Sequence, residues 1–243
     1  MAALGGRTAV VTGASSGIGA ATVRALRDAG VRVAGGARRT DRLEGDVRLE
    51  LDVTDPASCE RFVAGAVEAL GGTVDILVNA AGLGLGRDPF TKSTEADERV
   101  VLETNVNGLV RMTRLVLPHL AESGHIVNLG SVAGRQAYEN GSLYVASKFA
   151  VRGFTYALRE DLLGRPIRIT TVDPGLVETE FSLVRFRGDE AQASAVYEGV
   201  EAMRPEDIAE CILFALTRPP HVNVDELVVK ATAQSSGARI VRR

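Results

Sequence analysis

Short apolar runs alternate with helical patterns along the whole chain. The runs that predict strands are rich in β-branched residues and bounded by turn residues; they cover 8–11, 31–34, 47–51, 74–79, 124–129, 167–172 and 226–230. The stretches between them carry apolar residues at helical spacing, and they predict helices over 20–29, 56–70, 94–120, 143–163 and 205–216. Gly108 and Pro118 leave open whether 94–120 is one helix or two. Continuously apolar strands that alternate with helices predict an α/β fold: one doubly wound parallel sheet of about seven strands, with helices on both faces.

The length and the polar positions at strand ends predict one domain with one site. With 243 residues, 45% of them hydrophobic, residues 1–243 suit a single large domain better than two small ones. Asp52, Asn79, Ser131 and Pro174 stand at the ends of predicted strands. Ligands of such sheets bind outside the carboxyl ends of the strands, so we expect these residues to meet there.

A glycine-rich turn joins the first strand to the first helix. It reads Thr12-Gly13-Ala14-Ser15-Ser16-Gly17-Ile18-Gly19. This strand–turn–helix context is what a phosphate-binding loop of a Rossmann-type fold requires, because the helix N-terminus presents free N–H groups and a positive dipole end. We expect Gly13 to allow the tight turn, Gly17 the approach of a pyrophosphate, and Gly19 close packing of helix on strand. A flexible glycine turn without a ligand is the alternative.

Ser131, Tyr144 and Lys148 form a candidate catalytic group. Residues four apart share one helix face, so the Tyr144 phenol and the Lys148 ammonium should lie side by side. A neighbouring cation lowers the pKa of a phenol, and a phenol tuned in this way can exchange a proton with a carbinol oxygen. Tyr-Lys pairs with this spacing also occur by chance, and the glycine-rich turn in the same chain makes this one informative.

Two arginines predict which dinucleotide is bound. Arg38 and Arg39 follow the second strand, where a carboxylate would otherwise bind the ribose 2′-hydroxyl of NAD. A guanidinium instead binds a 2′-phosphate, so the sequence favours NADP(H). Solvated loop charges are the alternative for both arginines.

Taken in order, these motifs resemble those of the classical short-chain dehydrogenase/reductases, and the resemblance covers nearly the whole chain. The residues that carry it are 12–19, Asp52, 79–82, Asn105, Ser131, Tyr144, Lys148, 174–175 and Thr179. The resemblance implies that Ser131 binds the substrate oxygen, that Tyr144 and Lys148 carry out proton transfer, and that Asn105 holds a water of the proton relay. The residues expected at the cofactor are Gly13, Ser15, Ser16, Gly17, Ile18, Gly19, Arg38, Arg39, Asp52, Val53, Asn79, Ala80, Gly82, Tyr144, Lys148, Pro174, Gly175, Val177 and Thr179.

The resemblance also implies a substrate lid over about 177–200. This segment and 221–225 look similar to a branch that acts on 3-hydroxy acids, including serine-like and allo-threonine-like substrates. Arg185 or Arg187 is then expected to pair with the substrate carboxylate, although both could equally face solvent or a neighbouring subunit. The residues expected at the substrate are Gln136, Tyr138, Phe181, Arg185 and Arg187.

The expected function is hydride transfer between NADP(H) and a secondary alcohol or ketone, with a 3-hydroxy acid as a candidate substrate. A reductase of bulkier ketones is one alternative, and an NADP-sensing regulator without turnover is another. The complete set of Asn105, Ser131, Tyr144 and Lys148 argues against the regulator, which needs no acid/base group.

Composition excludes several other classes of function. A net charge of −3 and a pI near 5.7 give no reason to expect nucleic acid or an anionic membrane as a partner. Two cysteines and three scattered histidines predict no metal site, and the cysteine usage fits a cytoplasmic protein.

Helices 94–120 and 143–163 carry more apolar surface than one sheet face needs. We therefore expect a homo-oligomer, a tetramer or a dimer.

Overall fold

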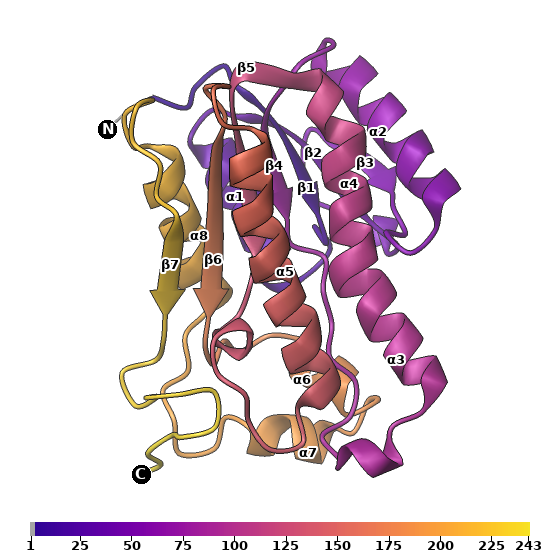
Figure 1. Ribbon diagram of the computed structural model, residues 1–243, viewed down its shortest axis with the longest axis vertical. Helices are drawn as coiled ribbons and strands as arrows, with labels where there is room; N and C mark the ends of the chain where they lie inside the picture. Colours follow the sequence, from indigo (N-terminus) through magenta and orange to yellow (C-terminus); the bar gives the residue numbers. More distant parts are fainter. Residues whose placement is uncertain (1–2) are drawn as a thin grey trace.

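Seven parallel strands form one sheet in the computed structural model, which describes residues 3–243 (Figure 1). In sheet order the strands are β3 (Val47–Glu50), β2 (Arg32–Ala37), β1 (Thr8–Thr12), β4 (Val74–Asn79), β5 (Leu120–Leu129), β6 (Arg168–Pro174) and β7 (Glu226–Val229). The predicted parallel α/β sheet is confirmed. The strand order reverses beside β1, where Thr12 lies level with Gly36 of β2 and Asn79 of β4. Ligands of such sheets bind outside this switch point.

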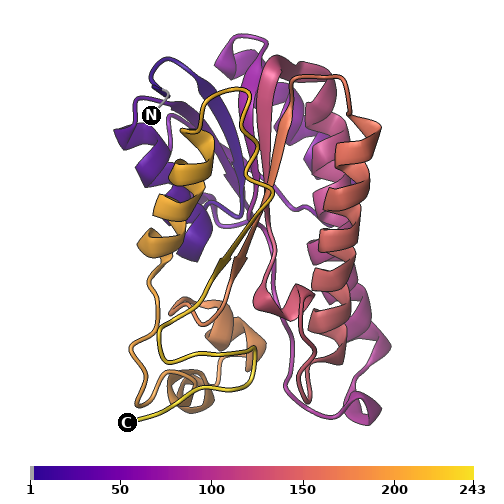
Figure 2. The same ribbon diagram turned by 60° about the vertical axis from the view of Figure 1, so that its left-hand side comes forward.

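Two helical layers cover the sheet, and Figure 2 shows them on its opposite faces. The helices of one face are α1 (Gly17–Asp28) and α8 (Pro205–Leu216), and those of the other are α2 (Pro56–Leu70), α4 (Gly108–Val116) and α5 (Ser142–Asp161). Buried Leu26 and Ile212 pack in the first layer, and Phe62 and Met112 in the second. Successive strand residues point to opposite layers, so strands buried on both faces read as continuous apolar runs.

The 94–120 segment forms two helices. Helix α3 (Glu95–Leu102) ends in a π-helical turn over Glu103–Asn107, and α4 starts at Gly108. Pro118 lies in a 3-10 turn that ends the segment, and β5 begins at Leu120 rather than at the expected residue 124. Single π-helical turns occur mostly at functional sites, and this one buries Asn105.

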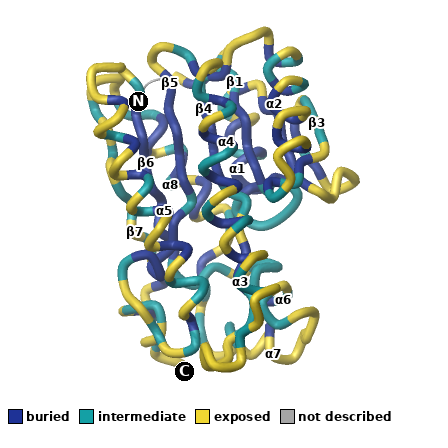
Figure 3. The backbone as a smooth tube through the Cα atoms, turned by 45° about the vertical axis from the view of Figure 1, so that its right-hand side comes forward, coloured by how far each residue is buried: buried dark blue, intermediate teal, exposed yellow. Residues whose placement is uncertain are grey.

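Two short helices lie beyond the carboxyl ends of the strands, where the sequence had only weak periodicity. They are α6 (Phe181–Arg185) and α7 (Glu190–Ala195), and the Asp189 side chain caps α7 by accepting from the Gln192 N–H at 3.0 Å. Figure 3 shows that this end of the molecule is mostly exposed, whereas the strands are buried. Within residues 3–243, no helix has the length and apolarity needed to cross a membrane.

Candidate active site

A cavity of about 450 Å³ opens at the carboxyl ends of the strands. Its wall contains every residue expected at the cofactor except Asn79. The Asn79 amide is buried and donates to Thr113 Oγ1 at 3.0 Å and to Asn128 Oδ1 at 2.9 Å. Asn79 therefore links β4 to β5 and α4 beneath the cavity, and unlike the other residues expected at the cofactor it does not line the cavity.

The glycine-rich turn forms one end of this cavity. Gly13 has a φ of 68°, and a Cβ there would lie 2.8 Å from the Ala81 Cα. A Cβ on Gly19 would lie 2.2 Å from the Gly13 carbonyl oxygen, so helix α1 can approach β1 only without a side chain at that position. Ser16 precedes α1 and makes no side-chain cap, which leaves the first N–H groups of the helix for an anion. This end fits a pyrophosphate.

Two arginines of the loop after β2 lie next to this turn, and one of them, Arg39, lines the cavity. Arg39 donates to Ser16 Oγ at 3.0 Å and pairs with Glu180 at 2.8 Å. Arg42 pairs with the other carboxylate oxygen of Glu180 at 2.9 Å. Glu180 directly precedes α6, so these ion pairs join the α6 segment to the loop after β2 across the cavity rim. Sequence reasoning did not identify Glu180, because nothing local marks it as a partner of residues so far away in the chain.

Ser131, Tyr144 and Lys148 share the opposite wall of the cavity. Ser131 caps a 3-10 turn, and its Oγ accepts from the Ala133 N–H at 3.1 Å. Lys148 is buried, and its Nζ donates to the Leu129 carbonyl at 2.8 Å and lies 5.8 Å from the Tyr144 ring centre. Residues 131, 144 and 148 are therefore brought together as the sequence predicted.

The pKa values in this wall are governed first by burial. Burial raises the pKa of Tyr144 to about 12, although a hydrogen bond with Ser131 and the charge of Arg185 act in the opposite direction. Burial lowers the pKa of Lys148 to about 8, and the charge of Asp173 opposes that shift. We expected Lys148 to bring the phenol below its ordinary pKa. In this structure the desolvation of Tyr144 is the larger effect.

The π-helical turn holds Asn105 beside this wall. Its amide oxygen accepts from the Leu83 N–H at 2.8 Å, and its nitrogen donates to the Leu83 carbonyl at 2.8 Å and to Ser147 Oγ at 3.0 Å. A Cβ on Gly82 would lie 3.3 Å from Asn105 Oδ1 and 3.6 Å from Lys148 Nζ. Asn105 is thus fixed near the ammonium but does not itself line the cavity.

The two lid arginines have different surroundings. Arg187 donates to both carboxylate oxygens of Asp97, at 2.7 and 2.8 Å, and so ties the lid to α3. The Arg185 guanidinium lies 5.1 Å from the Tyr144 ring centre and 5.4 Å from that of Phe181, and it donates to the Tyr138 hydroxyl at 2.8 Å. Within residues 3–243, the buried Arg185 Nε has no hydrogen-bond partner.

A second cavity of about 80 Å³ adjoins the first. Tyr144 lines both cavities, and Arg185 and Arg187 line the smaller one. Phe181 lines the larger cavity, with its ring centre 5.3 Å from that of Tyr144. Gln136 is exposed and lines neither cavity, so of the residues expected at the substrate it has the least support.

Two further findings concern metal binding and a buried carboxylate near Ser131. No cluster of histidine, cysteine or acidic residues able to hold a metal occurs between residues 3 and 243. Asp173, which the sequence patterns did not single out, is a buried carboxylate directly before Pro174. It accepts from the Ser131 N–H at 3.1 Å. A charged residue directly before Pro174-Gly175, at the carboxyl end of a strand, was the signal that could have identified it.

Known proteins match this chain over most of its length. The family model for short chain dehydrogenases matches residues 7–187. An NADP-dependent 3-hydroxy acid dehydrogenase of Schizosaccharomyces pombe is 41% identical, with 100% of this chain and 99% of that protein covered. Its counterpart of the same name in Escherichia coli is 41% identical over 96% of this chain and 98% of that protein.

Solved structures give the same result. The closed form of a serine dehydrogenase complexed with NADP+ matches with a TM-score of 0.90 and 39% identity, over 97% of this chain and 99% of that chain. The serine dehydrogenase of Escherichia coli matches with a TM-score of 0.79 and 37% identity, over 94% and 99% of the two chains. On the sequence match, the strand order and the cavity at the sheet's switch point, the chain belongs to the short chain dehydrogenase family.

Proposed function

We propose that this protein is an NADP-dependent oxidoreductase that interconverts a secondary alcohol and a ketone, with a 3-hydroxy acid as its substrate. The observation that carries the substrate class is Arg185, whose buried Nε has no partner within residues 3–243 and whose guanidinium lies beside Tyr144. An ammonium or guanidinium left without a counterion near the reacting group favours an anionic substrate. The names of the relatives, which are NADP-dependent 3-hydroxy acid dehydrogenases, support the same class.

The cofactor lies along the larger cavity in this proposal. The N-terminus of α1 would hold its pyrophosphate, and Arg38 and Arg39 would hold its 2′-phosphate, since both line the cavity and no acid occupies the end of β2. Arg39 contacts Glu180 and Ser16 through Nη2, so its other nitrogens remain as donors for a phosphate. The closed NADP+ complex that this chain resembles supports that choice. When bound, the nicotinamide supplies or accepts the hydride.

Tyr144 is the proposed proton donor and acceptor. With its pKa raised to about 12 by burial, the phenol is protonated near neutral pH and can donate to the carbonyl oxygen during reduction. Oxidation needs the phenolate, which the Arg185 guanidinium stabilises through its charge. The Lys148 ammonium adds to this effect below its own pKa of about 8. Reduction should therefore be favoured near neutral pH, and oxidation in alkali.

The remaining groups orient the substrate and complete the path of the proton. The Ser131 hydroxyl holds the reacting oxygen, and Asn105 fixes the backbone beside Lys148. Arg185 binds the carboxylate, whereas Arg187 is already bound by Asp97 and serves to attach the lid. The lid itself spans about 177–200, within a single domain that covers residues 1–243.

The exposed surface and the composition support a proposal for assembly and location. Val100 of α3 and Phe149 of α5 are exposed apolar side chains on neighbouring helices. We expect these helices to pair across a two-fold axis in a homo-oligomer, a tetramer or a dimer, located in the cytoplasm. Light scattering at micromolar concentration tests this, and a monomer would refute it.

A substrate screen tests the proposed function. The protein is assayed for NADP+ and NAD+ reduction with 3-hydroxybutyrate, serine, allo-threonine and the neutral 3-hydroxybutyramide, and for NADPH oxidation with bulky ketones. We expect turnover with NADP+, and faster turnover of the acids than of the amide. A preference for bulky ketones would support the reductase alternative. Tight NADPH binding without any turnover would support the sensing role.

A further inference from the structure

We propose that Asp173 is a positioning residue of the proposed reaction. It fixes the backbone at Ser131 and, through Arg135 and Glu226, ties the Ser131 loop to the helix that carries Tyr144 and Lys148. This inference rests on the proposed function, because it assigns Asp173 to the same reaction.

Asp173 contacts the Ser131 loop at two points. The residue is 1% exposed, and it lies at the end of β6 beside Pro174. One carboxylate oxygen accepts from the Ser131 N–H at 3.1 Å, and the other accepts from Arg135 Nε at 2.7 Å. Residues 131 and 135 belong to one short turn, so a single carboxylate holds both ends of that turn.

The carboxylate occupies the space that a side chain at residue 130 would take. A Cβ on Gly130 would lie 1.8 Å from Asp173 Oδ1. No real Cβ contact is that short, so Asp173 can reach the Ser131 N–H only because residue 130 is glycine.

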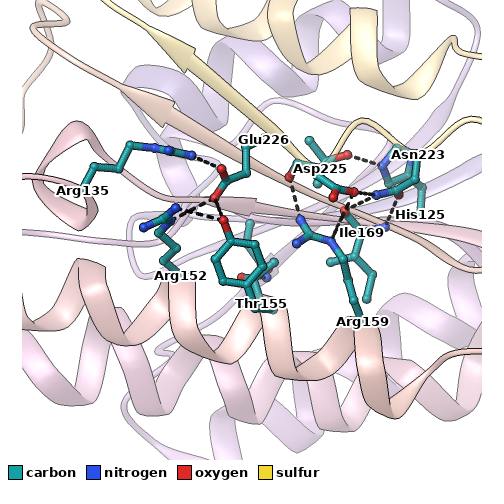
Figure 4. Close-up of polar contacts among 12 residues, drawn as sticks. His125, Arg135, Arg152, Thr155, Arg159, Ile169, Asn223, Asp225 and Glu226 are labelled. Carbon is teal, nitrogen blue, oxygen red and sulfur yellow. Dashed lines mark hydrogen bonds and ion pairs between the residues drawn. The ribbon is translucent and has the colours of Figure 1, made fainter.

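Arg135 and Glu226 connect this loop to helix α5. The Arg135 guanidinium also pairs with Glu226 of β7, as Figure 4 shows. Glu226 in turn accepts from Arg152 Nε at 3.0 Å and from the Tyr156 hydroxyl at 2.7 Å. Although burial raises the Glu226 pKa, the hydrogen bonds from Tyr156, Arg135 and Arg152 bring it to about 2. Glu226 is thus ionised across the working pH range.

The anchors on α5 lie on the same face as the catalytic pair. Tyr144, Lys148, Arg152 and Tyr156 follow one another at intervals of four residues, so they form one stripe along the helix. The network therefore joins the loop that presents the Ser131 hydroxyl to the same helix stripe that presents the phenol and the ammonium. Relative displacement of such groups by ~1 Å is enough to reduce a rate ~100-fold.

The network also places a fixed negative charge beside the reacting groups. Burial raises the pKa of Asp173, and the Arg135 guanidinium acts in the opposite direction. The other charged or titratable groups near the Tyr144 phenol are Arg185 of α6, Tyr138 of the loop before α5, and Lys148 one turn further along α5. Asp173 raises the pKa of both Tyr144 and Lys148. Loss of its charge should therefore lower both pKa values.

A purely stabilising role is the alternative, and buried ion pairs often contribute little net stability. Asp225 offers a matched control. Asp225 directly precedes Glu226 in the chain and also contacts helix α5, where it pairs with Arg159 at 3.7 Å (Figure 4). Its contacts do not connect to the Ser131 loop. Asp225→Asn thus removes one acid between β7 and α5 but leaves the contacts of Asp173, Arg135 and Glu226 in place.

The experiment compares Asp173→Asn, Glu226→Gln and Asp225→Asn with the wild type, on whichever substrate the wild type turns over. An absence of activity towards 3-hydroxy acids would therefore count against the proposed substrate and not against this inference. We measure kcat, the KM values, the pH profile of oxidation and the thermal midpoint. In Asp173→Asn the side-chain amide keeps an oxygen that can accept from the Ser131 N–H, but the charge is lost.

We expect Asp173→Asn to lower kcat by about 10- to 100-fold, with little change in the KM for NADPH. The limb of its oxidation profile that rises with pH should move to lower pH, because the phenol loses a neighbouring negative charge. Glu226→Gln should lower kcat by at least about threefold, and Asp225→Asn should change it by less than about twofold.

Two results would overturn the inference. One is an Asp173→Asn variant with wild-type kcat and an unshifted pH profile, even if its thermal midpoint has fallen. The other is a Glu226→Gln variant whose kcat equals that of Asp225→Asn. The second comparison decides the matter if Asp173→Asn does not fold, because Glu226 touches neither Ser131 nor the cavity.

Discussion

Arg185→Ala tests the proposed carboxylate site most directly. A charge-assisted, two-pronged contact between a guanidinium and a carboxylate is worth about 1.5–3 kcal/mol. At about 1.4 kcal/mol for each factor of ten, this corresponds to a loss of about 10- to 150-fold in kcat/KM for a 3-hydroxy acid. Arg185 already donates to the Tyr138 hydroxyl at 2.8 Å, which leaves fewer of its donors for the substrate. We therefore expect the lower part of that range, about 10- to 50-fold.

The assay must separate charge recognition from damage to the lid. Arg185 also stabilises the Tyr144 phenolate, so its removal can slow every substrate to the same degree. The decisive quantity is therefore the ratio of kcat/KM for 3-hydroxybutyrate to that for 3-hydroxybutyramide, which differ in charge at nearly the same size. Arg185→Lys retains the cation but not the planar fork, and should give an intermediate ratio.

Arg187→Ala is the matched control. It removes an arginine two positions away, whose guanidinium is held by Asp97 at 2.7 Å. This variant should loosen the lid and affect both substrates alike. Equal losses for acid and amide in Arg185→Ala, or a larger change of the ratio in Arg187→Ala, would refute the assignment of the carboxylate to Arg185.

Three further predictions concern other parts of the molecule. Tyr144→Phe should reduce turnover by at least about 100-fold while NADPH still binds in a fluorescence titration; turnover within about threefold of wild type would remove Tyr144 from the reaction. Arg39→Ala should weaken NADPH binding by about tenfold or more but NADH binding much less, and equal losses would show a general disturbance of the loop. Buried His125 has its pKa lowered to about 3 by burial, with Arg168 and Arg7 adding to the effect, so an unfolded chain with an ordinary histidine pKa of about 6.5 binds a proton that the folded chain does not. The contribution of this group to the free energy of unfolding is therefore complete above about pH 6.5 and falls at lower pH, by about 2 kcal/mol at pH 5. His125→Asn should reduce this dependence of the free energy of unfolding on pH, measured by urea titration at several pH values. An unchanged pH dependence would contradict the prediction.

Local patterns were sufficient to predict the sheet and most of its helices. Strands buried on both faces must be apolar throughout, and glycine or proline marks their ends, so β1, β4 and α2 appeared close to their observed bounds. Helix α1 begins at Gly17, earlier than expected, because its first turn contains two glycines and carries no apolar periodicity. The break before α4 is a π-helical turn, which leaves no compositional mark of its own.

The site was predictable where its residues stand at strand ends or share one helix face. Ser131, Tyr144 and Lys148 met as expected for that reason. Arg185 and Arg187, by contrast, are the same residue type on the same segment, and what distinguishes them is Asp97 on a distant helix. Glu180 was missed for a similar reason, because its arginine partners approach it only through tertiary packing.

The close fit between residues 130 and 173 constrains how this sequence can change. Any side chain added at residue 130 meets the carboxylate at residue 173 before it meets anything else, since the nearest approach is 1.8 Å to Asp173 Oδ1. A residue larger than glycine at 130 therefore requires a shorter residue at 173, and also a change at Thr171, whose Cγ2 would lie 2.8 Å from the added Cβ. The shorter residue at 173 would remove the acceptor for the Ser131 N–H. A mutant library that varies one position alone would recover only glycine at 130. A different arrangement of this loop would require residues 130, 171 and 173 to vary together.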